Sequence, residues 1–89
     1  MPLTGSLLER TQQAIVDAFR RQELDQFVRI RLDENFEAIV RDDNLRVQVY
    51  ELLLWASRHG RELELLDRLA AERPHTADFA AVAEALRTS

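Results

Sequence analysis

The clearest pattern of hydrophobic and polar positions lies in residues 44–60. Apolar residues recur there at i, i+4, i+7, i+8 and i+11, which is the spacing of one face of an α-helix. They are Leu45, Val49, Leu52, Leu53 and Ala56. A second apolar stripe consists of Val47, Tyr50 and Leu54. A helix that is apolar on more than half of its circumference packs at the centre of a fold, with helices on both sides. We therefore expect Leu52 and Trp55 in the core.

The same periodicity predicts the other elements of the chain. Helices are expected over residues 7–20, 23–32, 61–73 and from Thr76 onward, with a short helix or single turn at 36–40. Ser6 and Glu9 have the spacing of a capping box ahead of the first helix. Asn44 or Asp43 can cap the central helix, and Gly60 can end it in the left-handed conformation.

Amphipathic helices joined by short links are typical of an all-α fold, so the sequence predicts a compact six-helix bundle. The chain has only two glycines and two prolines, too few for the many tight turns of an all-β fold. With 89 residues and a hydrophobic content of 46%, it suits one domain with a single core. We expect residues 1–89 to form one domain of a longer multidomain protein.

Cysteine usage and the apolar runs bear on where the protein acts. The chain has no cysteine, which excludes disulfides and thiolate metal sites and fits a reducing compartment. The longest apolar run, residues 52–56, is far below the ~20 residues that cross a bilayer. The first residues lack the charged and apolar regions of a signal peptide. These observations predict a cytoplasmic protein with no membrane partner.

Charge along the chain bears on the class of partner. All twelve basic residues are arginine, and the net charge is −4. Within residues 32–45 the only basic residue is Arg41, and the acidic residues are Asp33, Glu34, Glu37, Asp42 and Asp43. A nucleic-acid-binding domain would have a basic stripe instead. We therefore expect no nucleic acid partner.

Candidate catalytic and metal-binding residues are sparse. His59 and His75 are the only histidines, and neither has a second ligand at metal-binding spacing. The adjacent carboxylates lie in predicted loops, which suits solvation better than acid–base chemistry. There is no glycine-rich phosphate loop and no nucleophile elbow. The sequence therefore predicts a protein that is not an enzyme and that needs no metal or cofactor.

The densest charged stretch is the candidate partner-binding surface. It contains Arg29, Arg31, Asp33, Glu34 and Glu37, and Asp42 and Asp43 follow it in the chain. One interpretation is a solvated helix face, and the other is a docking surface of two signs. Arg29 and Arg31 are two residues apart and cannot share a helix face, so we expect one to face inward and the other to be free. Acids on a different side would then favour head-to-tail contacts between copies.

Several short motifs occur in an order that resembles the bacterial effector-associated domain 1 family. They are Leu3-Thr4-Gly5, Ala18-Phe19, the Arg-x-Arg-Leu-x-x-Asn element at 29–35, Trp55-Ala56, Gly60-Arg61 and Ala71-Glu-Arg-Pro74. No single motif is specific, but their order and spacing together are. The resemblance covers about residues 3–75. The chain departs from the family pattern at Phe36, where the family usually has leucine.

The resemblance implies a death-domain-like six-helix fold that acts as an adaptor in bacterial conflict and immune systems. Such domains are fused to effectors such as proteases, nucleases or TIR-like modules, or to sensor NTPases, and pair homotypically with like domains. The family carries no catalytic residues, and this background favours the docking interpretation of the charged stretch. Two alternatives stay open: a DNA-binding regulatory module, which needs a basic face, and a small-molecule sensor, which needs a sizeable pocket.

Overall fold

A computed structural model describes residues 5–88, and within them the chain folds into six helices and no strand. The helices are α1 (Gly5–Ala18), α2 (Arg21–Arg31), α3 (Phe36–Ile39), α4 (Leu45–Arg58), α5 (Glu62–Glu72) and α6 (Ala77–Thr88). The predicted all-α, six-helix architecture is confirmed. Leu3 and Thr4, which open the first motif of the family resemblance, lie outside the described residues.

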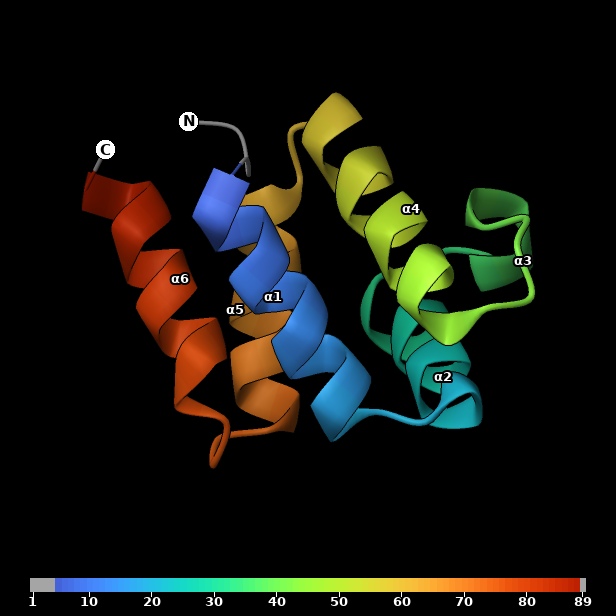
Figure 1. Cartoon of the computed structure of the whole chain (residues 1–89), viewed down its shortest axis with the longest axis horizontal. Helices are drawn as coiled ribbons and strands as arrows, with labels where there is room; N and C mark the ends of the chain where they lie inside the picture. The colour runs from blue at the N-terminus through green and yellow to red at the C-terminus, as the bar shows by residue number, and fades with distance from the viewer. Residues whose placement is uncertain (1–4, 89) are drawn as a thin grey trace.

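The helices form one globule with axes of 33, 27 and 22 Å. Helix α1 lies between α4 and α6, and α5 packs against both α6 and α4 (Figure 1). Helices α2 and α3 form the end of the molecule farthest from α6, where α3 contacts both α2 and α4 (Figure 1). Helix α4 therefore joins the α1–α5–α6 part of the fold to the α2–α3 part.

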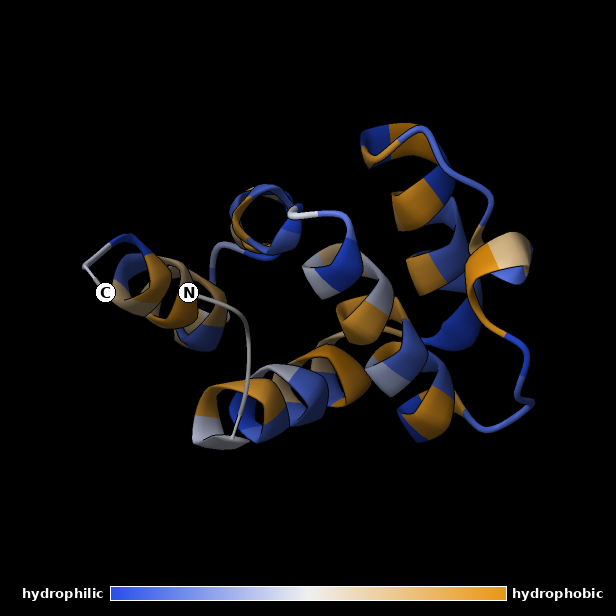
Figure 2. Ribbon diagram, turned by 90° about the horizontal axis from the view of Figure 1, so that it is seen from above, coloured by the Kyte–Doolittle hydropathy of each residue, from blue (hydrophilic) through white to orange (hydrophobic). Residues whose placement is uncertain are grey.

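Each helix contributes apolar side chains to a single continuous core. Hydrophobic and hydrophilic segments alternate along the helices (Figure 2). The largest fully buried side chains are Phe36, Phe79, Ile15, Leu24, Leu52, Leu53, Leu65, Leu66, Leu69, Gln48, Val28 and Val49. The prediction for Leu52 is confirmed, since this side chain is fully buried. Burying such residues is the main favourable term in the stability of a fold of this size.

Helix α4 has other helices on both sides, as predicted, but they do not cover its second apolar stripe. Val47 and Tyr50 remain 40% and 41% exposed, and Leu54 is only partly buried. Trp55 is also partly buried and packs against the edge of the core rather than within it. The reason is that α4 contacts α1, α3 and α5, and none of these helices reaches its remaining side.

Both ends of α4 are capped as predicted, whereas the predicted cap of α1 is not found. The Asn44 side chain accepts hydrogen bonds from the backbone N–H groups of Arg46 and Val47, which confirms it as the cap of α4. Gly60 has a φ of 65° and ends that helix as predicted. The capping box at Ser6 is wrong, because α1 already begins at Gly5 and Ser6 lies inside its first turn.

Candidate interaction surface

Arg61 ties the loop after α2 to the start of α5. Its guanidinium donates to the Leu32 carbonyl at 3.2 Å, to Glu34 at 3.0 Å and to Glu64 at 2.8 Å. The same group lies 5.0 Å from the centre of the Trp55 ring. A planar fork of five donors suits such simultaneous contacts, which a lysine could not make. Arg61 therefore has a structural role, holding two connections of the fold together.

Arg73 has the equivalent role at the opposite end of α5. It donates to the Ala18 carbonyl at 3.2 Å and to Glu23 at 3.1 Å, and its guanidinium lies 4.2 Å from the centre of the Phe19 ring. These contacts fasten the α1–α2 connection to the end of α5. Arg61 and Arg73 both lie in motifs of the family resemblance, and in this chain both side chains hold neighbouring segments of the fold together.

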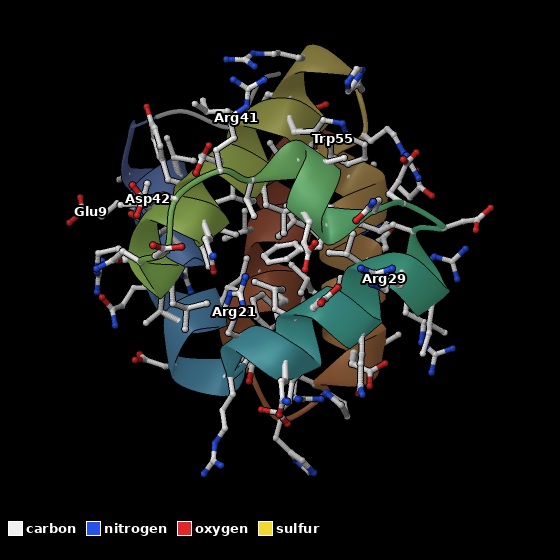
Figure 3. All side chains as sticks on the ribbon, turned by 90° about the vertical axis from the view of Figure 1, so that its right-hand side faces the viewer. Glu9, Arg21, Arg29, Arg41, Asp42 and Trp55 are labelled. Carbon is white, nitrogen blue, oxygen red and sulfur yellow. The ribbon has the colours of Figure 1, made fainter. Side chains whose placement is uncertain are left out.

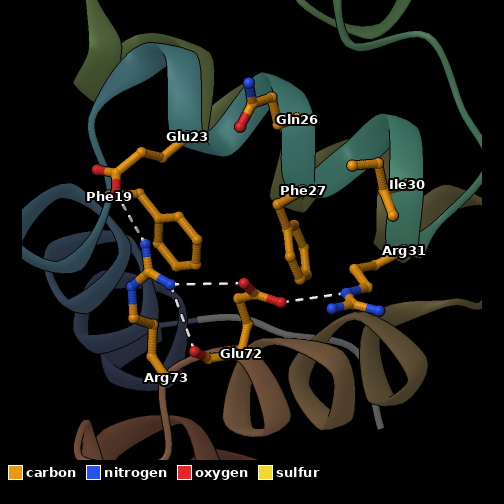
Figure 4. A pocket seen from close by; sticks show the side chains of 8 residues that line it. All are labelled: Phe19, Glu23, Gln26, Phe27, Ile30, Arg31, Glu72 and Arg73. Carbon is orange, nitrogen blue, oxygen red and sulfur yellow. Dashed lines mark hydrogen bonds and ion pairs between the residues drawn. The ribbon is translucent and has the colours of Figure 1, made fainter.

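A chain of ion pairs extends from Arg73 across a groove between α2 and α5. Glu72 pairs with Arg73 on one side and with Arg31 on the other, at 3.7 and 3.1 Å (Figure 4). The groove has a volume of about 220 Å³. Ile30, at its edge, is 70% exposed, which makes it the most exposed large apolar side chain among the described residues.

Arg29 and Arg31 both lie on the solvent side of α2. Arg29 pairs with Asp25 one turn earlier, at 2.7 Å, and Arg31 pairs with Glu72. The hydrogen bond and charge of Asp25 raise the pKa of Arg29 above its ordinary value. The expectation that one arginine faces inward and the other is free is therefore wrong. The buried face of α2 consists of Leu24, Phe27 and Val28, and neither arginine belongs to it.

The first group of predicted acidic residues lies at the end of α2 and in α3. Asp33 is exposed and has a φ of 54°, in the left-handed region that non-glycine residues seldom adopt. Glu34 is the partner of Arg61, and Glu37 is exposed on α3. Arg29, Asp33 and Glu34 line one shallow surface depression, so these charges of opposite sign share a side of the domain. The predicted separation of the two signs is not found for this group.

Asp42 and Asp43 lie in the loop between α3 and α4. Figure 3 shows Asp42 well apart from Arg29. Both aspartates are exposed. The Asp42 side chain accepts a hydrogen bond from the backbone N–H of Asn44 at 2.8 Å. Glu51 on α4 accepts from the backbone N–H groups of Arg41 and Asp42, at 3.3 and 3.2 Å, and this anchors the loop. Asp43 makes no side-chain hydrogen bond or ion pair with the described residues.

The sequence interpretation missed the apolar part of this surface. A groove of about 500 Å³ runs between α3 and α4, and its apolar walls are Ile39, Leu54 and Trp55. Arg41 and Trp55 lie beside α3 in Figure 3, and Tyr50 and Arg58 also line the groove. The signal was present as the second apolar stripe of α4, which periodicity alone assigned to the core. The candidate interaction surface therefore combines this stripe with the flanking charges.

The Arg61–Glu64 pair shows how local contacts change protonation. The hydrogen bond between the two side chains is the largest cause of both shifts. It lowers the pKa of Glu64 and raises the pKa of Arg61 relative to their ordinary values. Both groups are therefore charged over the whole neutral range.

Two further observations concern metal sites and membrane-spanning helices. Among residues 5–88, no group of three or more histidine, cysteine or acidic side chains is placed to hold a metal ion. None of the six helices is both long and apolar enough to span a membrane.

Comparison with known proteins places the chain in a family. No curated protein matches the chain, and no solved structure matches it. A family model for effector-associated domain 1 matches residues 1–87, which include all but the last residue of the described fold. The match covers nearly the whole chain and agrees with the motif order found in the sequence. The chain therefore belongs to the effector-associated domain 1 family.

Proposed function

We propose that this domain is a non-catalytic adaptor that recruits or clusters effector modules by pairing with like domains in bacterial defence signalling. Its partners would be effector-associated domains on the same or other proteins. These would carry effectors such as a protease, a nuclease or a TIR-like module. The observation that carries the proposal is the family match over residues 1–87, since the family is named for its association with effectors.

The surface offers the chemistry that protein partners recognise. Val47 and Tyr50 are exposed on α4, Ile30 is exposed on α2, and arginines and acids surround them. Interface centres are enriched in aromatic side chains and arginine, and charged rims steer partners into register. A surface of this kind supports docking better than it supports simple solvation. The charged residues Arg29, Arg31, Asp33, Glu34, Glu37, Asp42 and Asp43 are the proposed rim.

Weak pairing is sufficient for the proposed role. An adaptor that links two effectors converts their encounter from a bimolecular event into one within a single assembly. The effective concentration of tethered modules reaches the millimolar range. Under such conditions a weak contact between domains is sufficient to bring effectors together, and the effectors separate again when the assembly dissociates.

The proposal is tested by measuring whether the domain pairs at all. The purified domain is immobilised and offered the wild-type domain in solution, at low and at high salt, and light scattering is recorded in parallel. We expect capture that weakens with salt, because screening at ~0.15 M already acts over about 8 Å. Asp42→Arg combined with Asp43→Arg should reduce capture, and circular dichroism shows whether the double variant is folded.

One outcome would overturn the adaptor proposal, and another would overturn only the charged rim. If neither the wild-type domain nor any other member of the family is captured at any salt concentration, the adaptor proposal is overturned. If capture occurs but is indifferent to both the charge reversal and salt, pairing stands. In that case the charged rim is not the interface.

A further inference from the structure

One face of α4 and its preceding loop is both apolar and charged. Val47, Tyr50 and Leu54 occupy its middle, Asp43 precedes them, and Arg58 follows in the last turn. At ~100° per residue the four positions within the helix, from Val47 to Arg58, fall within an arc of roughly 80°. Asp43 lies in the loop two residues before the first residue of the helix. Val47, Tyr50, Asp43 and Arg58 are exposed, and Leu54 is partly buried. We call this set of five residues the α4 stripe.

The two charges of the α4 stripe are not used by the fold. Neither Asp43 nor Arg58 has a side-chain hydrogen bond or ion pair among residues 5–88. The neighbouring charges are engaged: Arg46 donates to Gln13 on α1, and Glu51 accepts from the loop backbone. The stripe therefore presents one free acid, an apolar centre and one free base.

We propose that the α4 stripe is the contact between two copies of this chain, packed with their α4 helices antiparallel about a twofold axis. This inference rests on the proposed homotypic function and specifies the surface and the symmetry through which it acts. The partner is a second copy because the stripe is complementary to itself when it is reversed.

The self-complementarity follows from the order of the residues along the helix. In an antiparallel pair with its twofold axis between residues 50 and 51, Val47 faces Leu54 of the other copy, and the two Tyr50 rings lie beside each other near the axis. Asp43, in the loop just before the helix, lies at the end of the stripe that meets the last turn of the other copy, which carries Arg58. Two ion pairs thus flank an apolar centre, in the arrangement of core and rim that protein interfaces have.

Twofold pairing closes on itself. An isologous contact uses the same patch on both copies and leaves no free end, so it forms dimers and not filaments. Three apolar side chains and one ion-pair partner at each end make an interface below about 1,200 Å² per dimer, the range of weak and transient contacts. Such a dimer is reversible, which suits the clustering of tethered effectors.

Charge complementation tests the geometry directly. Asp43→Arg leaves arginines at both ends of the stripe, and Arg58→Asp leaves aspartates at both ends. Each variant alone would face its own copy with like charges. Mixed together, the two variants face each other with opposite charges at both ends. Arg21→Asp is the matched control, since Arg21 is exposed on α2 and has no ion pair among residues 5–88.

Sedimentation equilibrium over a range of protein concentrations measures how strongly each variant dimerises. We expect the wild-type domain to form dimers and no larger species. Each single variant should dimerise at least roughly tenfold more weakly. A one-to-one mixture of Asp43→Arg with Arg58→Asp should restore dimers, as should the two changes combined in one chain. Arg21→Asp keeps the wild-type stripe and should dimerise like the wild-type domain, and thermal melts confirm that every variant is folded.

The contrary outcomes separate this inference from the function on which it rests. If the wild-type domain self-associates but the mixture is no stronger than the single variants, the twofold α4 contact is wrong and homotypic pairing stands. The same conclusion follows if the domain grows into open polymers, or binds only effector-associated domains of other proteins. If the domain pairs with nothing, both proposals fail.

Discussion

The buried side chain of Gln48 donates a 2.6 Å hydrogen bond from Nε2 to the backbone carbonyl of Asp42, six residues earlier in the chain. Glu51, one turn further along α4, accepts from the N–H of the same Asp42. Two side chains of α4 therefore hold both backbone polar groups of one loop residue. The other side-chain atom of Gln48, Oε1, is buried and has no hydrogen-bond partner. These two side chains thus hold the α3–α4 loop, which carries two of the proposed rim acids, against α4.

Gln48→Glu should destabilise the domain in a pH-dependent manner. A carboxylate at this site would be buried and would face the Asp42 carbonyl, so we expect a cost of about 3 kcal/mol or more at pH 7. Burial raises the folded-state pKa of the new acid above its unfolded value, so the loss is smallest below the unfolded pKa. Near pH 4 the protonated acid can donate to the carbonyl as the amide does. Urea unfolding of both proteins at pH 4 and pH 7 measures the difference, and an equal cost at both would contradict the assigned contact.

Leu52→Ala should be costlier than Trp55→Ala, although tryptophan is the larger residue. Leu52 is fully buried, and its truncation leaves a cavity that costs about 2–5 kcal/mol. Trp55 is partly buried, and solvent already reaches its ring, so we expect about 1–2 kcal/mol. Denaturant midpoints of the two variants decide the order. The reverse order would mean that Trp55 belongs to the core, as its position on the helix first indicated.

Arg61→Lys should destabilise the domain although it keeps the charge. A lysine can replace one of the contacts to Leu32, Glu34 and Glu64 but cannot make all three at once, so we expect a loss of about 1–2 kcal/mol. Arg10→Lys is the matched control, because Arg10 has a single exposed pair with Asp78. Equal unfolding free energies for the two variants would show that the Arg61 contacts do not stabilise the fold.

Glu64→Gln should reduce stability at neutral pH and not in acid. The Arg61 hydrogen bond holds the folded-state pKa of Glu64 below its unfolded value. The contribution is therefore present above the unfolded pKa and is lost as the pH falls through the lower folded-state pKa. Because the Glu64 side chain is 42% exposed, the effect should stay below about 1 kcal/mol. Chemical unfolding of both proteins at pH 7 and pH 3 should show a larger difference at pH 7 than at pH 3.

Gly60→Ala should strain the link between α4 and α5. The added methyl group meets no atom within 4 Å, but the φ of 65° disfavours any L side chain. We expect a cost of about 1–2 kcal/mol from backbone conformation alone. Gly60→Asn, whose side chain tolerates this region better, should cost less. Thermal melts of the two variants compare them, and equal melting temperatures would show that φ at this position does not matter.

The sequence by itself determined the helices, the caps of α4 and most of the core. Helical periodicity and capping act within a turn or two, so spacing alone located Asn44 and Gly60 at the ends of α4 and Leu52 on its buried face. The order of short motifs also indicated the family, because such order is a property of the chain itself and does not depend on how the helices pack.

Only the tertiary structure decided which apolar face stays uncovered and which charges meet. Periodicity shows that Val47 and Tyr50 share a face of α4, but coverage depends on where the other helices lie, and none covers that side. Arg31 and Glu72 are 41 residues apart, and Arg73 and Glu23 are 50 apart. Such pairs form because α2 and α5 face each other across a groove, and no local rule of spacing specifies that placement. The free charges of the α4 stripe can be recognised only from the tertiary structure, because an unpaired charge is defined by the positions of all its possible partners.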